Sequence, residues 1–385
     1  MRILTVGNMY PPHHLGGYEL MWRSAVAHHR AAGHDVSVLT TDWREPDASG
    51  ADERDVHREL RWYWHDHDFP RLTVGERLAL ERHNARVLDR RLEEFTPDVV
   101  SWWAMGGMSL SLIERARRAG LPAAATVVDD WLIYGPRVDA WWRLLRRRAR
   151  RLESSSRFLF ASHTLRASAR EAGFDPPRAE VYQPGIDLEL FKDPGKEESN
   201  WGWRLLYCGR IDERKGIDTA IEALERLPPE ATLRIVGGGD ALHLAQLHAL
   251  VDRLGLADRV SFERHRRSEL PEIYAAADAL IFPVRWVEPF GLVPLESMAC
   301  GTPVVATGRG GSGEYLRDGE NCLLFGVEGG APALAEALDR LARDAELRGR
   351  LVAAGRMVAE RFPEGAFNDA CLATLERARR ESSGQ

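Results

Sequence analysis

The chain has 385 residues, 44% of them hydrophobic and 29% charged, which excludes a disordered, collagen-like or coiled-coil protein over most of its length. A formal net charge of −6 argues against a dedicated nucleic-acid-binding protein, which normally carries a basic domain. No run of the sequence approaches the roughly 20 apolar residues of a membrane span. Since domains usually have about 100–200 residues, this length indicates two domains.

The N-terminal residues 1–6 predict a buried strand instead of a signal segment, so we expect the protein to stay in the cytoplasm. The four cysteines are widely spaced and lie in the second half of the chain, at Cys208, Cys300, Cys322 and Cys371. This spacing indicates buried free thiols, and neither a disulfide framework nor a zinc site.

Short apolar runs bounded by Gly, Pro or Asp alternate with longer stretches of helical periodicity. Strands are predicted at residues 3–6, 36–39, 99–102, 123–128, 158–160, 205–207, 233–236, 260–262, 279–282 and 304–306. Helices are predicted at residues 19–32, 78–94, 109–119, 219–226, 242–254, 334–341 and 364–379. This alternation is typical of an α/β protein, and the number of strands predicts two doubly wound parallel sheets.

Two stretches interrupt the alternation. Residues 44–71, which include Trp62, Tyr63 and Trp64, are charged, and we expect an irregular surface excursion of the first domain there. The seam between the domains is expected near residues 185–200, because residues 193–200 are polar and rich in chain breakers and a new buried strand begins at Arg204.

Adjacent glycines, Gly16 and Gly17, lie between the first predicted strand and the first predicted helix. Glycines at such a turn let backbone N–H groups and the positive helix end approach an anion such as phosphate, although a plain tight turn is an equal alternative. The pair is not a dinucleotide-binding fingerprint, since the G-x-G-x-x-G spacing is missing.

A second loop after a predicted strand carries Arg210 and Lys215, which could clamp a diphosphate. The other lysines of the chain are Lys192 and Lys196, so a lysine here in an arginine-rich protein favours a functional role. Two further glycine-rich turns follow strands. Residues 237–239 suit close backbone packing as well as ligand contact, and residues 307–314 are expected to line the same cleft as the loop that precedes them.

The strongest signal is the segment 288–306, in which seven residues separate Glu288 from Glu296. A helix is expected to open around Leu292, with the N–H groups of Phe290, Gly291 and Leu292 free at its start and Glu296 about one turn inside. Glu296 can accept two ribose hydroxyls, while Glu288 can face a sugar ring or a developing oxocarbenium charge.

In this order, the motifs resemble glycosyltransferase family 4, whose members are retaining, nucleotide-sugar-dependent enzymes of GT-B fold. The resemblance extends over nearly the whole chain and rests on the Gly16-Gly17 turn, residues 184–191, Arg210 with Lys215, Glu288 with Glu296, and the glycine turn ending at Glu314. It implies two Rossmann-like domains facing across a cleft. Residues 1–186 would bind the acceptor, residues 187–363 the nucleotide-sugar donor, and residues 364–385 would form a helix that crosses back onto the first domain.

One motif departs from the family pattern. Family members commonly carry a histidine followed by aspartate after the fourth N-terminal strand, where it approaches the transferred sugar. Asp129 replaces that histidine on the simplest alignment and Val128 on a shifted one, so the resemblance implies a catalytic place for Asp129. His163 is an alternative polar group, with a surface or capping role as the simpler interpretation.

Nine of the 12 tryptophans precede residue 190, and aromatic faces stack well on sugars, which suits an acceptor-binding domain. Trp102, Trp103 and Trp131 lie at the ends of predicted strands and are our candidates for acceptor contact, while core packing explains most of the others. The acceptor class stays open among carbohydrates, natural products and lipid-linked molecules. The basic, amphipathic segment 141–151 suits either peripheral contact with an anionic membrane or an exposed helix.

We therefore expect a metal-independent retaining glycosyltransferase that uses a nucleoside-diphosphate sugar as co-substrate, with no further cofactor and no nucleic-acid partner. The second domain has no Asp-x-Asp pair, and the one pair in the chain, Asp66-His67-Asp68, lies in the irregular excursion. The alternatives are a hydrolysing sugar-nucleotide epimerase of the same fold, or an inactive sugar-nucleotide-binding subunit, which the replaced histidine suggests. The oligomeric state stays open.

Overall fold

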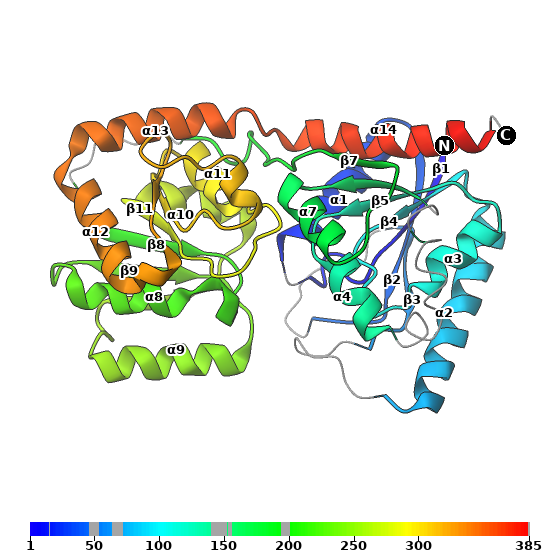
Figure 1. Ribbon diagram of the computed structural model, residues 1–385, viewed down its shortest axis with the longest axis horizontal. Helices are drawn as coiled ribbons and strands as arrows, with labels where there is room; N and C mark the ends of the chain where they lie inside the picture. The colour runs from blue at the N-terminus through cyan, green and yellow to red at the C-terminus, as the bar shows by residue number, and fades with distance from the viewer. Residues whose placement is uncertain are drawn as a thin grey trace. The chain divides into compact units, whose positions relative to one another are not determined.

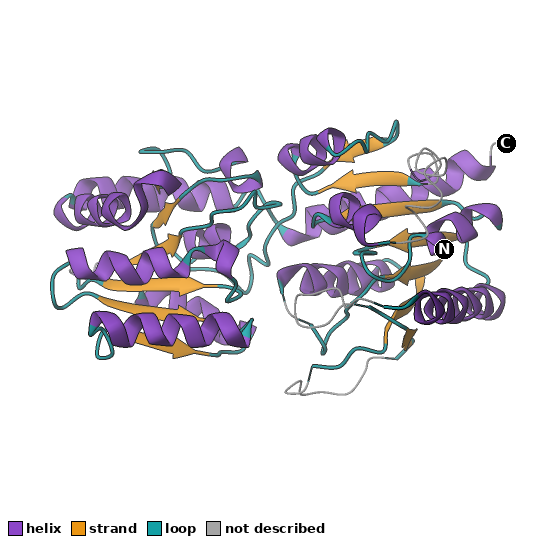
Figure 2. Cartoon of the chain, turned by 60° about the horizontal axis from the view of Figure 1, so that its bottom comes forward, coloured by secondary structure: helices purple, strands orange, loops and turns teal. Residues whose placement is uncertain are grey.

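The computed structural model describes residues 1–14, 16–45, 54–63, 72–139, 152, 156–193 and 201–383 (Figure 1). The chain divides into two compact units. Unit 1 consists of Met1–Gln183 together with Gly365–Gln385, and unit 2 consists of Pro184–Glu364. Both units are parallel sheets with helices packed on their faces, as Figure 2 shows for each sheet separately.

Unit 1 is built on a seven-stranded sheet of order β3-β2-β1-β4-β5-β6-β7, in which every neighbouring pair is parallel. The strands are β1 (Arg2–Val6), β2 (Asp35–Thr41), β3 (Val56–Leu60), β4 (Val99–Trp102), β5 (Ala123–Val127), β6 (Arg157–Phe160) and β7 (Ala179–Val181). The described helices of this unit are α1 (Gly17–Ala31), α2 (Val74–Phe95), α3 (Ser111–Arg118), α4 (Trp131–Val138), α7 (His163–Glu171) and nearly all of α14 (Glu364–Ser383).

Unit 2 repeats the same architecture with a six-stranded parallel sheet of order β10-β9-β8-β11-β12-β13. Its strands are β8 (Arg204–Cys208), β9 (Thr232–Val236), β10 (Val260–Glu263), β11 (Ala279–Phe282), β12 (Val304–Ala306) and β13 (Leu323–Leu324). Its helices are α8 (Ile217–Ala223), α9 (Ala241–Leu254), α10 (Leu270–Ala276), α11 (Val293–Ala299), α12 (Gly330–Arg343) and α13 (Ala345–Ala359). The predicted class, two doubly wound parallel sheets, is therefore confirmed.

The central strands form because their residues are apolar on both faces. All four residues of β11 are buried, as are all five of β5, and a parallel sheet covered by helices on both sides needs such continuous apolar runs. The side chains of β8, β9 and β11 pack with those of α8, α9 and α12 into the core of unit 2.

The strand orders place one switch point in each sheet. The chain order reverses between β1 and β4 in unit 1, and between β8 and β11 in unit 2. In open α/β sheets, ligands bind beyond the carboxyl ends of the strands at such a reversal. In unit 2, the segments at this position are the loop after β8 and the loop after β11, which carry Arg210, Lys215 and Glu288.

Helix α14 packs within unit 1, although the whole of unit 2 precedes it in the sequence (Figure 1). Phe367, Cys371 and Leu375 are 1–3% exposed, and they form the buried face of the helix predicted at residues 364–379. Asn368 Nδ2 donates to Ser24 Oγ of α1 at 2.9 Å, and Thr126 Oγ1 of β5 lies 3.9 Å from Cys371 Sγ. The helix therefore forms part of the cover of the first sheet.

Three strands were not expected from the sequence. The prediction of an irregular excursion over residues 44–71 is wrong for β3, which pairs in parallel with β2. Strand β3 carries His57, Arg58 and Glu59 at the edge of the sheet, so it lacks an apolar run. Strand β7 has three partly exposed residues, with Glu180 at its centre, so it also lacks an apolar run, and β13 has only two residues.

Several other expectations can be compared with the described residues. All four cysteines are free and buried, as predicted. Among the described helices, none is long and apolar enough to cross a membrane. Trp64, the pair Asp66 and Asp68, and the basic segment 141–151 lie outside the described residues.

Candidate active site

The loop after β8 is organised around Asp212. Its carboxylate caps the short helix Glu213–Lys215 by accepting the Arg214 N–H at 3.0 Å. It also accepts Arg210 Nη2 at 3.0 Å, Arg214 Nε at 2.9 Å and Arg214 Nη2 at 2.8 Å. Burial alone would raise the pKa of Asp212, but the hydrogen bonds and charge of Arg214, together with the charge of Arg210, hold it well below its usual range. Asp212 is therefore an ionised anchor for both arginines.

The loop after β11 brings Glu288 to this group. Lys215 Nζ lies 2.7 Å from Glu288 Oε2, and the Trp286 indole N–H donates to the same oxygen at 2.8 Å. The Lys215 and Glu288 side chains are 15% and 11% exposed, so this ion pair is largely shielded from water. The structure thus brings together two predicted site residues that are far apart in the sequence.

The two loops are also joined through their backbones. Arg285 N donates to Arg214 O at 2.9 Å, and Arg285 Nη2 donates to Asp218 Oδ2 and Thr219 Oγ1, each at 2.7 Å. Gly216 has a φ of +69°, and a Cβ there would lie 2.2 Å from Pro283 O, so this close approach requires glycine. The position of Lys215 relative to Glu288 is consequently fixed by several contacts.

Glu296 lies in the first turn of α11, as the sequence predicted, and is 5% exposed. Tyr274 OH donates to Glu296 Oε2 at 2.9 Å, and Arg267 Nη1 lies 3.6 Å from Oε1. Burial raises the pKa of Glu296, although the Arg267 charge and the Tyr274 hydrogen bond oppose the rise. Within the part of the chain that the structure describes, the N–H groups of Phe290 and Gly291 donate no hydrogen bond, as expected for a helix start open to a ligand.

The glycine turn after β12 lies against Glu288, which agrees with the expectation that it lines the same wall. Gly311 N donates to Glu288 O at 2.6 Å. A Cβ at Gly310, whose φ is +76°, would lie 2.3 Å from both Glu288 N and Glu288 O. Gly291 has a φ of +88°, and its carbonyl accepts Tyr315 OH at 2.5 Å. Glycine at these positions lets the backbones that carry the carboxylates pack closely.

For the glycine turn 237–239, the structure supports the packing alternative. Gly209 N donates to Val236 O and Ile211 N donates to Gly238 O, both at 2.9 Å. A Cβ at Gly237 would lie 1.9 Å from Gly209 O, and one at Gly239 would lie 2.0 Å from Ile211 O. The turn therefore supports the loop that carries Arg210.

In unit 1, Gly16 and Gly17 lie at the start of α1, after β1, close to where the sequence predicted them. Gly16 is the N-cap of α1 and its N–H donates to Glu19 Oε2 at 3.1 Å, while Gly17 is exposed. A Cβ at Gly17 would meet no atom within 4 Å, so packing does not require this glycine. Gly17 therefore leaves room for close backbone approach at the start of α1, while the Glu19 carboxylate occupies the Gly16 N–H.

Asp129 follows β5 and is partly buried beside Asp130. Burial, reinforced by the Asp130 and Glu19 charges, raises the pKa of the Asp129 carboxyl well above its usual range. The Trp131 N–H approaches Asp129 Oδ1 at 3.4 Å and opposes the rise. Asp129 therefore holds a proton at a higher pH than an ordinary aspartate. His163 is the exposed first residue of α7, in agreement with a surface role.

The three candidate acceptor residues of unit 1 have packing roles. Trp102, Trp103 and Trp131 are 0–1% exposed, and the Trp103 ring stacks on Trp22 with 6.0 Å between centroids. A ring without exposed surface offers no face to a sugar. The structure thus contradicts acceptor stacking by these side chains, because Trp102 and Trp103 at the end of β4 and Trp131 at the start of α4 are buried in the core.

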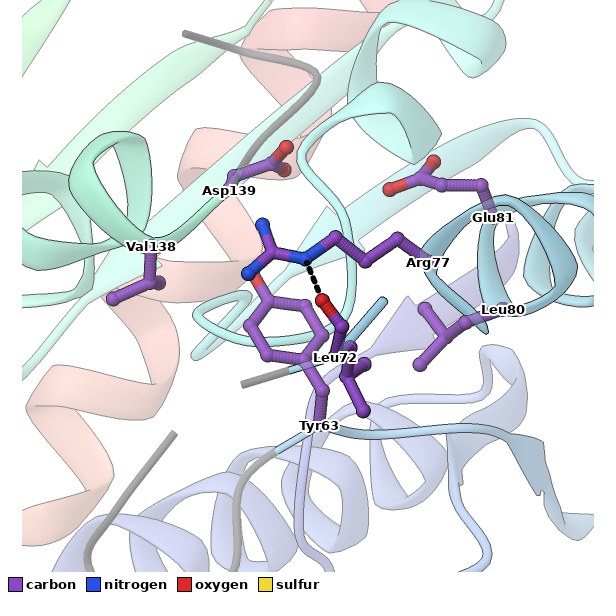
Figure 3. Close-up of a pocket in the computed structure, with 7 residues that line it drawn as sticks. All are labelled: Tyr63, Leu72, Arg77, Leu80, Glu81, Val138 and Asp139. Carbon is purple, nitrogen blue, oxygen red and sulfur yellow. Dashed lines mark hydrogen bonds between the residues drawn. The ribbon is translucent and has the colours of Figure 1, made fainter. Parts of the chain in front are cut away.

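Unit 1 also has a small pocket where α2, the end of α4 and the segment after β3 meet (Figure 3). It is lined by Tyr63, Leu72, Arg77, Leu80, Glu81, Val138 and Asp139. Its cavity volume of about 10 Å³ is roughly the room that one water molecule needs, so a sugar ring does not fit. Arg77 Nε donates to Leu72 O at 3.3 Å across it.

Sequence reasoning missed four contributors to the site in unit 2: Asp212, Arg267, Tyr274 and Trp286. Asp212 and Trp286 each lie two residues from a residue that was predicted, and a tryptophan in a loop is unusual enough to be a signal. Arg267 and Tyr274 lie on a separate segment, and nothing in their spacing pointed to Glu296. Among the described residues, no cluster of histidine, cysteine, aspartate and glutamate could hold a metal ion.

Two family models match adjoining halves of the chain. The model described as Glycosyltransferase Family 4 matches residues 15–190, and the model described as Glycosyl transferases group 1 matches residues 191–358. A D-inositol 3-phosphate glycosyltransferase from Frankia alni is 36% identical over 284 residues, which are 66% of this chain and 67% of that protein. The chain belongs to glycosyltransferase family 4.

A second D-inositol 3-phosphate glycosyltransferase, from Xylanimonas cellulosilytica, is 35% identical over 241 residues, 56% of each protein. A sucrose-phosphate synthase from Thermosynechococcus elongatus has a TM-score of 0.78 at 20% identity and covers 100% of both chains. HepE from Anabaena, solved in complex with UDP-glucose, has a TM-score of 0.73 at 21% identity over 98% of this chain and 100% of that one. The family 4 chain is thus a glycosyltransferase of GT-B fold, as predicted.

Proposed function

We propose that the protein transfers a sugar from a nucleoside-diphosphate sugar to an acceptor hydroxyl, with retention of the anomeric configuration and without a metal ion. The observation that carries this proposal is the group at the switch point of unit 2, where Lys215 and Arg210 lie in the same loop and Lys215 contacts Glu288. Cations beside a carboxylate at this position suit a ligand that carries a diphosphate next to a sugar.

The cations would replace a metal ion in neutralising the leaving diphosphate. A unit charge pair separated by ~4 Å is worth roughly 4 kcal/mol at an effective dielectric near 20, before desolvation. The free N–H groups of Phe290 and Gly291 would add hydrogen bonds to the phosphate oxygens. Arg210 and Lys215 would then share the charge of the departing group.

The retained configuration would follow from attack on the face that the diphosphate leaves. The acceptor oxygen forms a bond to the anomeric carbon as the bond from that carbon to the phosphate oxygen breaks. The acceptor proton passes to the same phosphate oxygen, so no second protein base is needed. Glu288, whose Oε2 is held by Lys215 and Trp286, would stabilise the positive charge on the sugar ring.

Other parts of the proposal rest on relatives. HepE was solved with UDP-glucose and with UDP, which supports a nucleotide-sugar donor in unit 2. The curated relatives are named for an inositol phosphate acceptor, so a phosphorylated polyol joins carbohydrates, natural products and lipid-linked molecules as an acceptor class. Gly16, Gly17 and Asp129 in unit 1 remain proposed contributors to donor binding and transfer.

One experiment tests the reaction. The protein is incubated with UDP-, GDP-, ADP- and dTDP-sugars, with and without candidate acceptors, and the released nucleotide and the anomeric form of the product are measured. Acceptor-dependent release with retention supports the proposal. Acceptor-independent release of an isomerised sugar would show an epimerase, and binding without turnover would show an inactive subunit.

The same assay in EDTA tests metal independence. Turnover should be unchanged, because the proposal assigns neutralisation of the diphosphate to Arg210 and Lys215. Turnover that is lost in EDTA and restored by magnesium or manganese would show that a metal neutralises the diphosphate.

A further inference from the structure

Trp286 makes contacts with the candidate donor site that the family resemblance does not use. The indole N–H donates to Glu288 Oε2 at 2.8 Å, and the guanidinium carbon of Arg214 lies 4.4 Å from the ring centroid. Lys215 Nζ lies 5.4 Å from the same ring. The ring is therefore held by a cation on its face while its polar edge holds a carboxylate.

The residues that contact Trp286 are themselves fixed by hydrogen bonds. Arg214 is fixed by two hydrogen bonds from its guanidinium to Asp212, at 2.9 and 2.8 Å. The Arg285 N–H, next to Trp286 in the chain, donates to Arg214 O at 2.9 Å. A continuous series of contacts thus runs from Asp212 through Arg214 and Trp286 to Glu288.

Glu288 has two cationic or polar partners on one oxygen. Lys215 and Trp286 both contact Oε2, and no hydrogen bond to Oε1 occurs among the described residues. Oε1 is therefore the oxygen left for a ligand. If Lys215 turns to a diphosphate, as the proposed function requires, Trp286 is the hydrogen-bond donor that remains on the Glu288 carboxylate among the described residues.

We propose that Trp286 is a positioning residue, which keeps Glu288 aimed at the sugar when Lys215 exchanges this carboxylate for the diphosphate of the donor. This inference rests on the proposed function and adds a specific division of roles. Lys215 first binds the diphosphate of the donor and then neutralises its charge as it leaves, while Trp286 keeps the Glu288 carboxylate in position during transfer. A carboxylate without its donors would lose the orientation that transition-state stabilisation needs.

Three variants test the role of the indole N–H. W286F keeps an aromatic face for Arg214 and removes the N–H, while W286L removes both. Val287, which is 47% exposed between these residues, provides the matched control V287A. W286F should lower kcat about tenfold, since a hydrogen bond to a charged group is lost, with nucleoside-diphosphate affinity held within about twofold. V287A should match the unaltered protein in both kcat and nucleoside-diphosphate affinity.

A double variant then tests whether Trp286 acts through Glu288. In the E288Q background, W286F should change turnover by less than about twofold, because the interaction that it removes is already altered. Independent, multiplying effects of the two substitutions would overturn the inference, and so would full kcat in W286F. If E288Q alone keeps full turnover, the catalytic role proposed for Glu288 fails instead.

A second readout does not need turnover. Departure of Lys215 from the pair should change the indole fluorescence of Trp286 when UDP, GDP, ADP or dTDP is titrated into the protein. The part of the change that comes from Trp286 is the difference between V287A and W286F at equal nucleotide binding by calorimetry, because the other 11 tryptophans are present in both variants. An equal change in the two variants would contradict the exchange, and a failure of all four nucleotides to bind would contradict the proposed function together with it.

Discussion

Glu288 and Glu296 are two buried carboxylates with different partners, and this difference separates their expected roles. Glu288 contacts the ammonium of Lys215 and an indole N–H, and it keeps one oxygen for a ligand. Glu296 is held by Tyr274 OH and lies beside Arg267, whose guanidinium carbon is 5.1 Å from the Phe191 ring centroid. The surroundings of Glu288 suit a carboxylate whose contact with the sugar changes during the reaction. The surroundings of Glu296 suit a carboxylate that makes the same binding contact throughout.

We predict distinct kinetic effects for E288Q and E296Q. E296Q should weaken donor and free nucleotide alike, by about 1.5–3 kcal/mol, because a ribose does not change during transfer. E288Q should lower turnover far more than nucleoside-diphosphate affinity, because its contact strengthens as charge develops on the sugar. Calorimetry with the nucleoside diphosphate, followed by turnover measurements, checks both. Equal losses of affinity without a loss of turnover would make the pair a nucleotide clamp.

A second residue-scale prediction concerns Glu81 at the small pocket of unit 1. Burial, with the nearby Asp139 charge, raises its pKa from 4.5 to about 7, although Ser109 and Ser111 donate hydrogen bonds to it. The folded state therefore binds a proton more tightly than the unfolded state. The resulting stabilisation is fully present below pH 4.5 and is lost as pH rises through about 7.

E81Q should remove this part of the pH dependence. The difference in unfolding free energy between pH 5 and pH 8 should shrink in E81Q by on the order of 1–3 kcal/mol, with the partial exposure of the side chain favouring the lower end. Urea unfolding of both proteins at the two pH values measures the difference, and the other titrating groups cancel in the comparison. An unchanged difference would show that Glu81 has an ordinary pKa.

At the scale of elements, the clearest contrast is between β11 and β3. Every residue of β11 is buried, and its apolar run predicted the strand from sequence alone. Strand β3 lies at the sheet edge with partly exposed polar residues, so its pairing depends on β2 and not on its own composition. Local patterns thus predicted the interior strands of each sheet and the edge strand β10, and missed the edge strands β3, β7 and β13.

The candidate site shows the same limit. Lys215 and Glu288 could be assigned from local motifs, but their contact depends on β8 and β11 lying side by side, which is a property of the sheet order. Trp286 had no motif of its own, because its role depends on Arg214 reaching across from the other loop. The burial of Trp102 and Trp103 could not be predicted either, since strand-end residues can point to solvent or to the core.

The support given by the turn after β9 leads to an element-scale prediction. Gly237 has a φ of +151°, and a Cβ there would lie 1.9 Å from Gly209 O. G237A should therefore displace the loop that carries Arg210. We expect it to weaken nucleotide binding at least tenfold, about 1.4 kcal/mol. Gly349 in α13 meets nothing within 4 Å and provides the control G349A, which should be neutral or slightly stabilising. Calorimetry with UDP, GDP, ADP and dTDP measures the loss, and unchanged affinity in G237A would contradict it.

At the scale of the whole molecule, the division into two units predicts that their stabilities respond separately. Leu375 of α14 is 1% exposed and belongs to unit 1. L375A should cost about 2–5 kcal/mol, as large-to-small changes in a core do. Hydrogen exchange should then accelerate for core amides of β1 and β5 and stay unchanged for those of β8 and β11.

Val74, which is 76% exposed on α2, supplies the control V74A, which should leave both sheets within about 0.5 kcal/mol of the unaltered protein. Equal acceleration of hydrogen exchange in the two sheets of L375A would show that the two units unfold together. The division of the chain into two units would then not correspond to separate unfolding.

Helix α14 also constrains the order in which the protein can be made. Unit 1 begins at Met1, but its last helix is translated only after every residue of unit 2. During synthesis, the first sheet therefore lacks one of its covering helices and exposes the apolar surface that later contacts Phe367, Cys371 and Leu375. Unit 2 follows it in the chain but can complete its own core earlier. Unit 2 is in effect an insertion within unit 1, and unit 1 receives its last helix only after unit 2 has been translated.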